Sequence, residues 1–240
     1  MRTMLYLSRW LGGVCGVLFL MTMLPTCMAQ AAQEATTLPA QKSQLKEISM
    51  NICILYGSTR PNRLGIRAVR FLEKNLAQSG HSVTVADAME EKLPLLENRL
   101  MDYEQGQAPA RLLALQKIFH EADAFIVITG EYNHTIQPGL ANLIDHFQPK
   151  DFGHRPVLLV TYSVGAYAGL RALEHARALT SAMGMISIPT TLAIAKIQTI
   201  LNENNESQDT KFVEQAQKGL TQLLWYAQAL KTAKETQGQP

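Results

Sequence analysis

The chain has 240 residues, 47% of them hydrophobic, and carries 22 Lys and Arg against 20 Asp and Glu, a formal net charge of +2. This length suits one folded domain with extensions better than two full domains. A charge so close to zero gives no electrostatic reason to expect nucleic acid or a membrane surface as a stable partner.

The N-terminal part of the chain differs in composition from the rest. Residues 1–31 have the pattern of an export signal: Arg2 and Arg9, an apolar run over 11–24, and the small-x-small sequence Ala29-Gln30-Ala31. Residues 32–49 are polar and lack apolar periodicity, which is typical of a linker. We therefore expect the folded domain to span residues 50–240.

From Met50 onward, apolar runs alternate with amphipathic stretches, a pattern typical of parallel strands joined by helices. Five strands and five helices are expected. The predicted strands are 51–56, 82–87, 124–129, 156–162 and 186–194. The predicted helices are 66–79, 110–122, 139–147, 169–183 and 210–234. The fold class is therefore α/β, a doubly wound five-stranded parallel sheet with helices on both faces.

The loop after the first strand has the composition of a phosphate site. It reads Gly57-Ser58-Thr59-Arg60-Pro61-Asn62-Arg63-Leu64-Gly65 and joins a strand to a helix N-terminus, where free backbone N–H groups and the helix dipole favour an anion. It matches neither a nucleoside triphosphate P-loop nor G-x-G-x-x-G, so a phosphate monoester fits better. A plain connecting turn with solvated arginines is the alternative.

The loop after the third strand, residues 129–139, is long and dense in polar and aromatic groups. It contains Glu131-Tyr132-Asn133-His134, followed by Pro138-Gly-Leu-Ala-Asn-Leu-Ile-Asp145. Together with the 57–65 loop, and at this separation, these motifs resemble the NADPH-dependent FMN reductase family, which includes quinone, azo-dye and chromate reductases. The resemblance covers about residues 50–194.

The resemblance implies a flavodoxin-like fold and a non-covalent FMN. It places Ser58, Thr59, Arg60, Asn62, Arg63, Leu64 and Gly65 around the phosphate and Glu131, Tyr132, Asn133 and His134 along the isoalloxazine ring. Asn142 and Asp145 would be structural, near a homodimer contact. The sequence departs from the family pattern at Gly130, where proline is usual, and at Ala141, where lysine is common.

The loop after the fourth strand is the weakest match. In the resembling family a glycine-rich loop here embraces the pyrimidine end of the flavin, and only part of that glycine content is present. Ser163, Val164 and Gly165 would line the flavin, with backbone donors from Val164 and Gly165 near its N1 atom. His134 is a candidate proton donor, but an exposed loop histidine more often lines a binding site than acts as a catalyst. The cysteines Cys15, Cys27 and Cys53 and the six histidines show no metal-ligand spacing.

The resemblance implies an enzyme that transfers hydride from NAD(P)H through FMN to a small acceptor, such as a quinone, a flavin, an azo compound or a metal oxyanion. No side chain need act as nucleophile or acid, because the cofactor performs the chemistry. A flavodoxin-type electron carrier and a flavin-less binding module are the alternatives.

The compartment depends on where translation begins. Met50 lies directly before the first predicted strand, and initiation there gives a cytoplasmic protein, which suits nicotinamide cofactors. Initiation at Met1 gives an exported protein that needs another reductant.

Overall fold

The computed structural model describes residues 49–239. The predicted export signal at 1–31 lies outside the described residues, as do all but the last residue of the predicted linker at 32–49 and two of the cysteines, Cys15 and Cys27. The third, Cys53, is buried and free. None of the helices within 49–239 combines the length and the apolar character needed to cross a bilayer.

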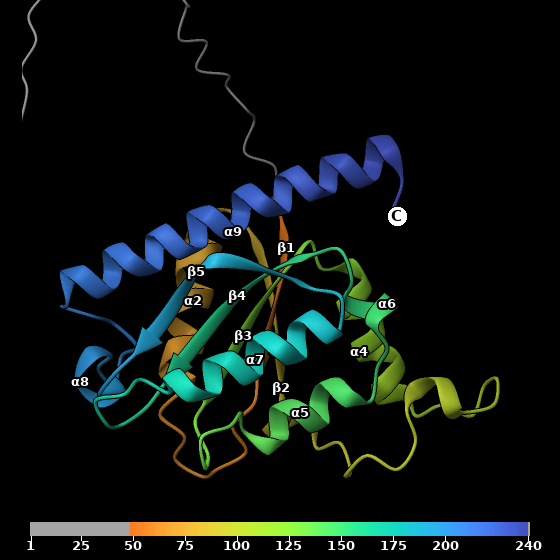
Figure 1. The fold of residues 1–240 in the computed structure, drawn as a ribbon, viewed down its shortest axis with the longest axis horizontal. Coiled ribbons are helices and arrows are strands. Elements are labelled where there is room, and N and C mark those ends of the chain that lie inside the picture. Colours follow the sequence, from red (N-terminus) through yellow and green to blue (C-terminus); the bar gives the residue numbers. More distant parts are fainter. Residues whose placement is uncertain (1–48, 240) are drawn as a thin grey trace, which may run out of the picture. The chain divides into compact units, whose positions relative to one another are not determined.

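Five parallel strands form one sheet in the order β2-β1-β3-β4-β5 (Figure 1). They are β1 (Asn51–Tyr56), β2 (Ser82–Asp87), β3 (Ala124–Gly130), β4 (Pro156–Tyr162) and β5 (Ile186–Ile194). The chain runs outward from β1 to β2, then returns past β1 to β3, so the order reverses between β1 and β3. Ligands bind at the carboxyl ends of strands beside such a reversal. The predicted doubly wound parallel sheet is confirmed.

Helices cover both faces of the sheet, because the side chains of each strand alternate between the two faces. Ile52, Ile54 and Tyr56 of β1 pack with α2 (Ile66–Gln78) and α9 (Thr210–Gln237). Cys53 and Leu55 face the second cluster of buried side chains, which is completed by the remaining long helices. Those helices are α4 (Ala110–Glu121), α5 (Pro138–Asp145) and α7 (Leu170–Ala182).

Four short helical turns were not predicted. They are α3 (Ala88–Glu91), the 3-10 turn Leu100–Asp102, α6 (Pro149–Phe152) and α8 (Ile197–Ile200). Each has only three or four residues, too few to show a helical period in the sequence.

The outer edge of β5 is protected by α9. Gln222 accepts a hydrogen bond from the Thr190 amide, Oε1 to N 2.9 Å, and Gln215 donates to the Thr191 carbonyl oxygen, Nε2 to O 3.2 Å. Pro189, which has no N–H, lies in the stretch where the pairing of β4 and β5 changes register.

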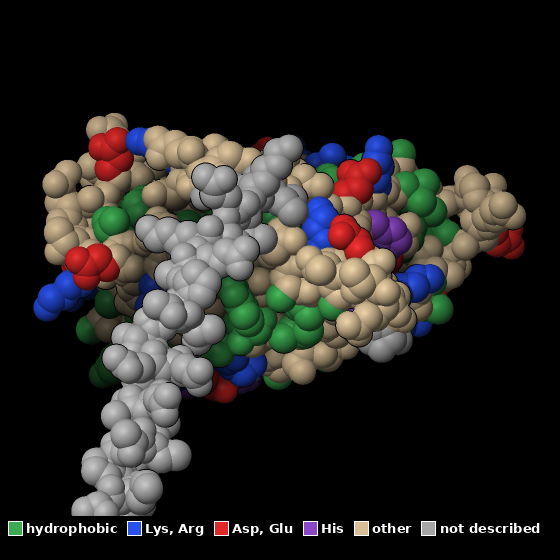
Figure 2. All heavy atoms as spheres, turned by 90° about the horizontal axis from the view of Figure 1, so that it is seen from above, with side chains coloured by type: hydrophobic (Ala, Val, Ile, Leu, Met, Phe, Trp, Pro, Cys, Tyr) green, Lys and Arg blue, Asp and Glu red, His purple; other side chains and the backbone are tan. Residues whose placement is uncertain are grey.

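Figure 2 shows one face of the molecule. Where its side chains are visible, acidic and basic ones are interspersed.

Candidate active site

Three loops meet at the carboxyl edge of the sheet beside the reversal in strand order. They are the first loop, residues 57–65 after β1, the second loop, residues 131–137 after β3, and the third loop, residues 163–169 after β4. Because β1, β3 and β4 are neighbours, their loops are adjacent. The structure therefore brings together the three segments that the sequence singled out.

The first loop presents unpaired backbone donors. The Gly57 amide donates to the Ile128 carbonyl, 3.2 Å, and the Arg67 amide donates to Leu64. Between them, every N–H from Ser58 to Ile66, apart from the imino residue Pro61, lacks an acceptor among residues 49–239. These donors lead into the N-terminus of α2, where the helix dipole adds positive potential. The geometry fits a phosphate monoester.

The two arginines of the first loop have different environments. Arg63 pairs with the Asp87 carboxylate, Nη2 to Oδ2 2.6 Å, and donates to the Ser58 carbonyl, 2.7 Å. Its guanidinium carbon lies 5.0 Å from the centroid of the Tyr56 ring, and its side chain is only 11% exposed. Arg60 is exposed and lies 5.9 Å from the centroid of the Tyr132 ring in the second loop. Phosphate binding by Arg60 or Arg63 stays a prediction.

Glycines allow the first loop to approach its neighbours closely. A Cβ on Gly57 would lie 2.5 Å from Leu140 Cβ, and one on Gly139 would lie 2.6 Å from the Gly57 carbonyl oxygen. A Cβ on Gly65 would lie 2.2 Å from the Tyr162 ring. Distances this short are not compatible with a side chain, so these glycines keep the first loop, α5 and β4 in contact.

The second loop contains a tight turn with an unusual backbone. Tyr132 and Thr135 exchange both of their backbone hydrogen bonds, each 3.0 Å, around Asn133 and His134. The two central residues have left-handed φ values of 50° and 68°. This conformation destabilises a non-glycine residue by about 1–2 kcal/mol, although asparagine tolerates it better. His134 is exposed, and its role as a proton donor stays a prediction.

A buried polar chain lies beneath the first and second loops. Gln137 donates to the Tyr162 hydroxyl, Nε2 to O 3.2 Å, and that hydroxyl lies 3.5 Å from the Tyr56 hydroxyl. Burial raises the pKa of Tyr56, so its phenol stays neutral. A Cβ on Gly130 would lie 2.9 Å from Gln137 Nε2 and 3.2 Å from the Tyr162 ring. A side chain at position 130 would therefore press on the Gln137 amide and the Tyr162 ring.

Hydrogen bonds from α8 and from the residue before it hold the third loop in place. Lys196 and Ile197 donate their amides to the carbonyls of Gly165 and Ser163, 2.9 Å and 3.0 Å, and Gln198 Nε2 donates to the Val164 carbonyl, 3.2 Å. The N–H groups of Val164 and Gly165 have no acceptor among the described residues. Donation from these two amides to a flavin stays a prediction.

A cavity of about 230 Å³ adjoins the first loop at Thr59 and lies against α3 and α5. Asn142 bonds to the segment beside it, donating to the Pro94 carbonyl, 2.9 Å, and accepting from the Leu96 amide, 3.0 Å. Glu91 also lines this cavity, and its carboxylate pairs with Arg111. Burial nevertheless raises the pKa of the Glu91 carboxyl. The other predicted structural residue, Asp145, has its pKa raised by burial as well.

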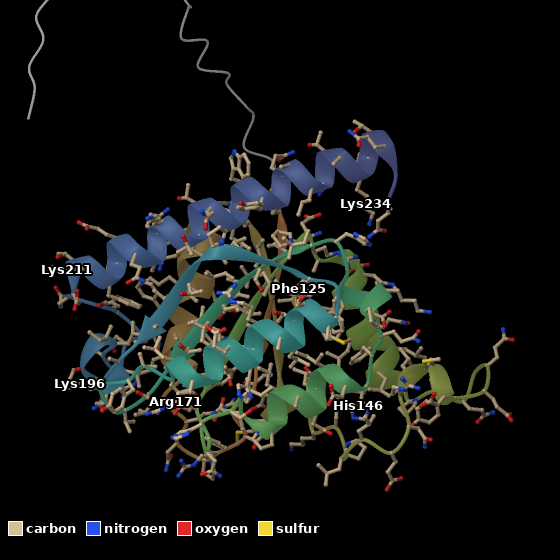
Figure 3. The ribbon with its side chains drawn as sticks, in the orientation of Figure 1. Phe125, His146, Arg171, Lys196, Lys211 and Lys234 are labelled. Carbon is tan, nitrogen blue, oxygen red and sulfur yellow. The ribbon has the colours of Figure 1, made fainter. Side chains whose placement is uncertain are left out.

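Sequence reasoning missed several residues that shape the site. Arg171 and His175 of α7 contact the second loop, and Lys196 to Gln198 hold the third. Figure 3 shows Arg171 at the end of α7 that faces the loops. Arg171 and His175 are spaced by four residues, which places them on one helix face, and this was the only signal available.

The family model for NADPH-dependent FMN reductase matches residues 50–199. The chain belongs to this family. It is therefore an NAD(P)H oxidoreductase with a flavodoxin-like fold, and both expectations from the sequence are confirmed.

One curated protein and two solved structures are similar to this chain. A quinone reductase of Escherichia coli K12 is 29% identical over 132 residues, which cover 53% of this chain and 68% of the relative. FerB, a flavoenzyme NAD(P)H:(acceptor) oxidoreductase of Paracoccus denitrificans, superposes with a TM-score of 0.63 at 19% identity, covering 75% of this chain and 98% of its own. An oxidoreductase of Corynebacterium diphtheriae gives 0.57 at 13% identity, covering 76% and 99%. At these identities the two structures support the fold alone.

Proposed function

We propose that this reductase binds FMN non-covalently across the three loops and uses it to carry electrons from NAD(P)H to a small acceptor. The observation that supports this most is the row of unpaired N–H groups from Ser58 to Ile66 at the reversal in strand order. When bound, the flavin accepts hydride and passes electrons on, so the protein need only bind, orient and exclude water.

The residues of the site divide into three groups. The amides of the first loop and the Arg60 guanidinium bind the terminal phosphate through charge-assisted hydrogen bonds. The backbone of Tyr132, Asn133 and His134 lines the ring. The Val164 and Gly165 amides, which have no acceptor among the described residues, would donate to the pyrimidine end of the flavin, where a reduced flavin carries negative charge. Quinones, flavins, azo compounds and metal oxyanions remain the candidate acceptors.

A homodimer is proposed as the working form. Leu95 is 82% exposed and Met101 51% exposed, and both lie on the segment that Asn142 fastens to α5. A second copy of the chain would remove this apolar surface from water. Light scattering across a concentration series measures the mass directly, and a purely monomeric protein would contradict the dimer.

We also propose that residues 50–240 form the functional unit and act in the cytoplasm after initiation at Met50. Mass spectrometry of the native N-terminus tests this. A terminus near residue 32 would show that the chain is exported instead.

Visible spectroscopy of the purified protein after reconstitution with FMN tests the main proposal. We expect a bound flavin spectrum that bleaches on addition of NADPH under anaerobic conditions and returns when a quinone is added. Bound flavin that NADPH does not bleach would favour an electron carrier. A protein that takes up no FMN would contradict both and favour a binding module.

A further inference from the structure

The turn of the second loop, Tyr132–Thr135, is tied to α7 at both of its ends. Before the turn, Glu131 Oε1 accepts a hydrogen bond from Arg171 Nη1, 2.8 Å, and Oε2 accepts from the Arg171 amide, 3.1 Å. At its end, Thr135 Oγ1 lies 2.8 Å from His175 Nδ1. Arg171 and His175 are one helical turn apart, so a single helix face holds both ends.

The Glu131 contact also completes α7. The residue before the helix is Gly169, which has no side chain to cap the first amides. The Glu131 carboxylate takes that place from another loop, bonding the Arg171 amide at the positive end of the helix dipole. Burial disfavours its charge, but the bonds from Arg171 outweigh this and hold the pKa of Glu131 below its usual range. The carboxylate is therefore ionised when it bonds to α7.

The turn needs such support, because its central residues, Asn133 and His134, both adopt left-handed φ values. Strained backbone of this kind persists only where surrounding contacts hold it. Arg171 is further ordered by Tyr167, whose ring centroid lies 5.1 Å from the guanidinium carbon. Tyr167 belongs to the third loop, so the same arginine contacts both loops that flank the proposed ring site.

We propose that Arg171 and His175 are positioning residues that hold the Tyr132–Thr135 turn in the flavin-binding conformation before any ligand arrives. This rests on the proposed function, because it assigns the turn to the ring of FMN. In this role both side chains act through the turn, by their bonds to Glu131 and Thr135. A preformed turn reduces the ordering that binding would otherwise require, so its loss weakens affinity.

The test uses the full chain with Arg171→Met, which keeps the length of the side chain and removes its charged hydrogen bond, and with Arg171→Met combined with His175→Phe. Arg171→Lys is the conservative variant. Arg177→Met is the matched control: the same change six residues further along α7, at a guanidinium with no hydrogen bond or ion pair among residues 49–239. Hydrogen exchange of the Tyr132 and Thr135 amides is measured without flavin, and FMN affinity by fluorescence quenching.

Arg171→Met should raise the exchange rate of both amides about tenfold and should weaken FMN binding about tenfold. Both effects should be larger in the double variant and smaller in Arg171→Lys. Arg177→Met should match the wild type. Amides of β1 and β3 in the same samples show whether the fold is intact.

Unchanged exchange in the double variant would overturn the proposal. So would faster exchange with undiminished FMN affinity, because the ties would then not serve the ligand. Failure of the wild type itself to bind FMN would instead contradict the proposed function, and the exchange rates of the flavin-free protein would still show whether the two ties hold the turn.

Discussion

Arg63 and Asp87 face each other across the end of the sheet, with Nη2 of the guanidinium 2.6 Å from Oδ2 of the carboxylate. Both side chains are almost fully buried, at 11% and 8% exposure. The pair connects the first loop to the end of β2. The structure therefore assigns Arg63 a bracing contact, although it lies within the predicted phosphate motif.

This arrangement predicts different effects for the two arginines. Arg63→Ala leaves the Asp87 carboxylate buried without its partner and should lower the free energy of unfolding by about 3 kcal/mol. Arg60→Ala should change it by less than about 0.5 kcal/mol. Arg60→Ala should instead weaken FMN binding by about tenfold, through the loss of one charge-assisted contact. Urea unfolding and FMN titration measure the two quantities. Equal stability of the two variants would contradict the bracing role.

A second prediction concerns the contact between the first loop and α5. In Gly57→Ala the added Cβ would meet Leu140 Cβ at 2.5 Å and the Leu140 backbone at 3.1 Å. The backbone must shift, so we expect a loss of about 1–3 kcal/mol in unfolding free energy together with weaker FMN binding. Gly219→Ala is the control, because its added Cβ would meet no atom closer than 3.5 Å and it lies in α9, outside the three loops. A tolerated Gly57→Ala would show that the two segments are not tightly packed.

The buried Glu91 predicts a dependence on pH. Burial raises the pKa of its carboxyl above the ordinary value of 4.5, although the Arg111 pair opposes this. The folded state therefore binds the proton of Glu91 more tightly than the unfolded state does. The contribution of this protonated carboxyl to the free energy of unfolding is fully present below pH 4.5, and it is lost as pH rises through the pKa of Glu91 in the folded state.

Glu91→Gln removes the titration and keeps an acceptor for Arg111. Its unfolding free energy should exceed that of the wild type at about pH 7.5 and show a smaller gain at about pH 4. Glu97→Gln, on an exposed position, should show no such difference. A gain for Glu91→Gln that is the same at both pH values would exclude ionisation of Glu91 as its source.

Asp151 offers a test that separates stability from function. Its carboxylate, 1% exposed, lies 2.7 Å from His120 Nε2 and accepts from Gln116 Nε2 and the Gln148 amide, both at 2.9 Å. Asp151→Ala leaves these donors without an acceptor and should reduce the unfolding free energy by about 3 kcal/mol.

Asp151 precedes β4, at the opposite edge of the sheet from the three loops, so FMN affinity should stay at the wild-type value. The control is Asp102→Ala, which removes an exposed pair with Arg99 and should lower the free energy of unfolding much less than Asp151→Ala does. If Asp151→Ala binds FMN more weakly under conditions where the variant is fully folded, the two edges of the sheet are energetically coupled, which would contradict this prediction.

The sequence predicted the elements well because the long apolar and amphipathic runs carry their own period. Four strands agree at both ends, and β3 extends one residue further, to Gly130. The helices agree within two or three residues at their ends. What escaped prediction were single-turn helices such as α8, whose importance comes from the bonds that Lys196 and Ile197 make to the third loop.

The roles of the site residues could be predicted only where they depend on the sequence of a single loop and not on contacts with other parts of the chain. The run of glycine, serine and threonine at 57–59 is visible in the sequence. The inward direction of Arg63 depends on Asp87, which lies beside Tyr56 only once β2 pairs with β1. The ties from Arg171 and His175 likewise require that α7 pack beside the second loop, a fact of tertiary structure that no local pattern contains.

The contacts between α9 and the edge of β5 have a consequence for synthesis on the ribosome. Gln215 and Gln222 follow Thr190 and Thr191 by more than twenty residues, so β5 leaves the exit tunnel well before the side chains that bond to its free backbone groups. During that interval β5 is an open strand edge to which a neighbouring nascent chain can add. We therefore expect the yield of correctly folded protein to depend on how quickly translation reaches the end of α9.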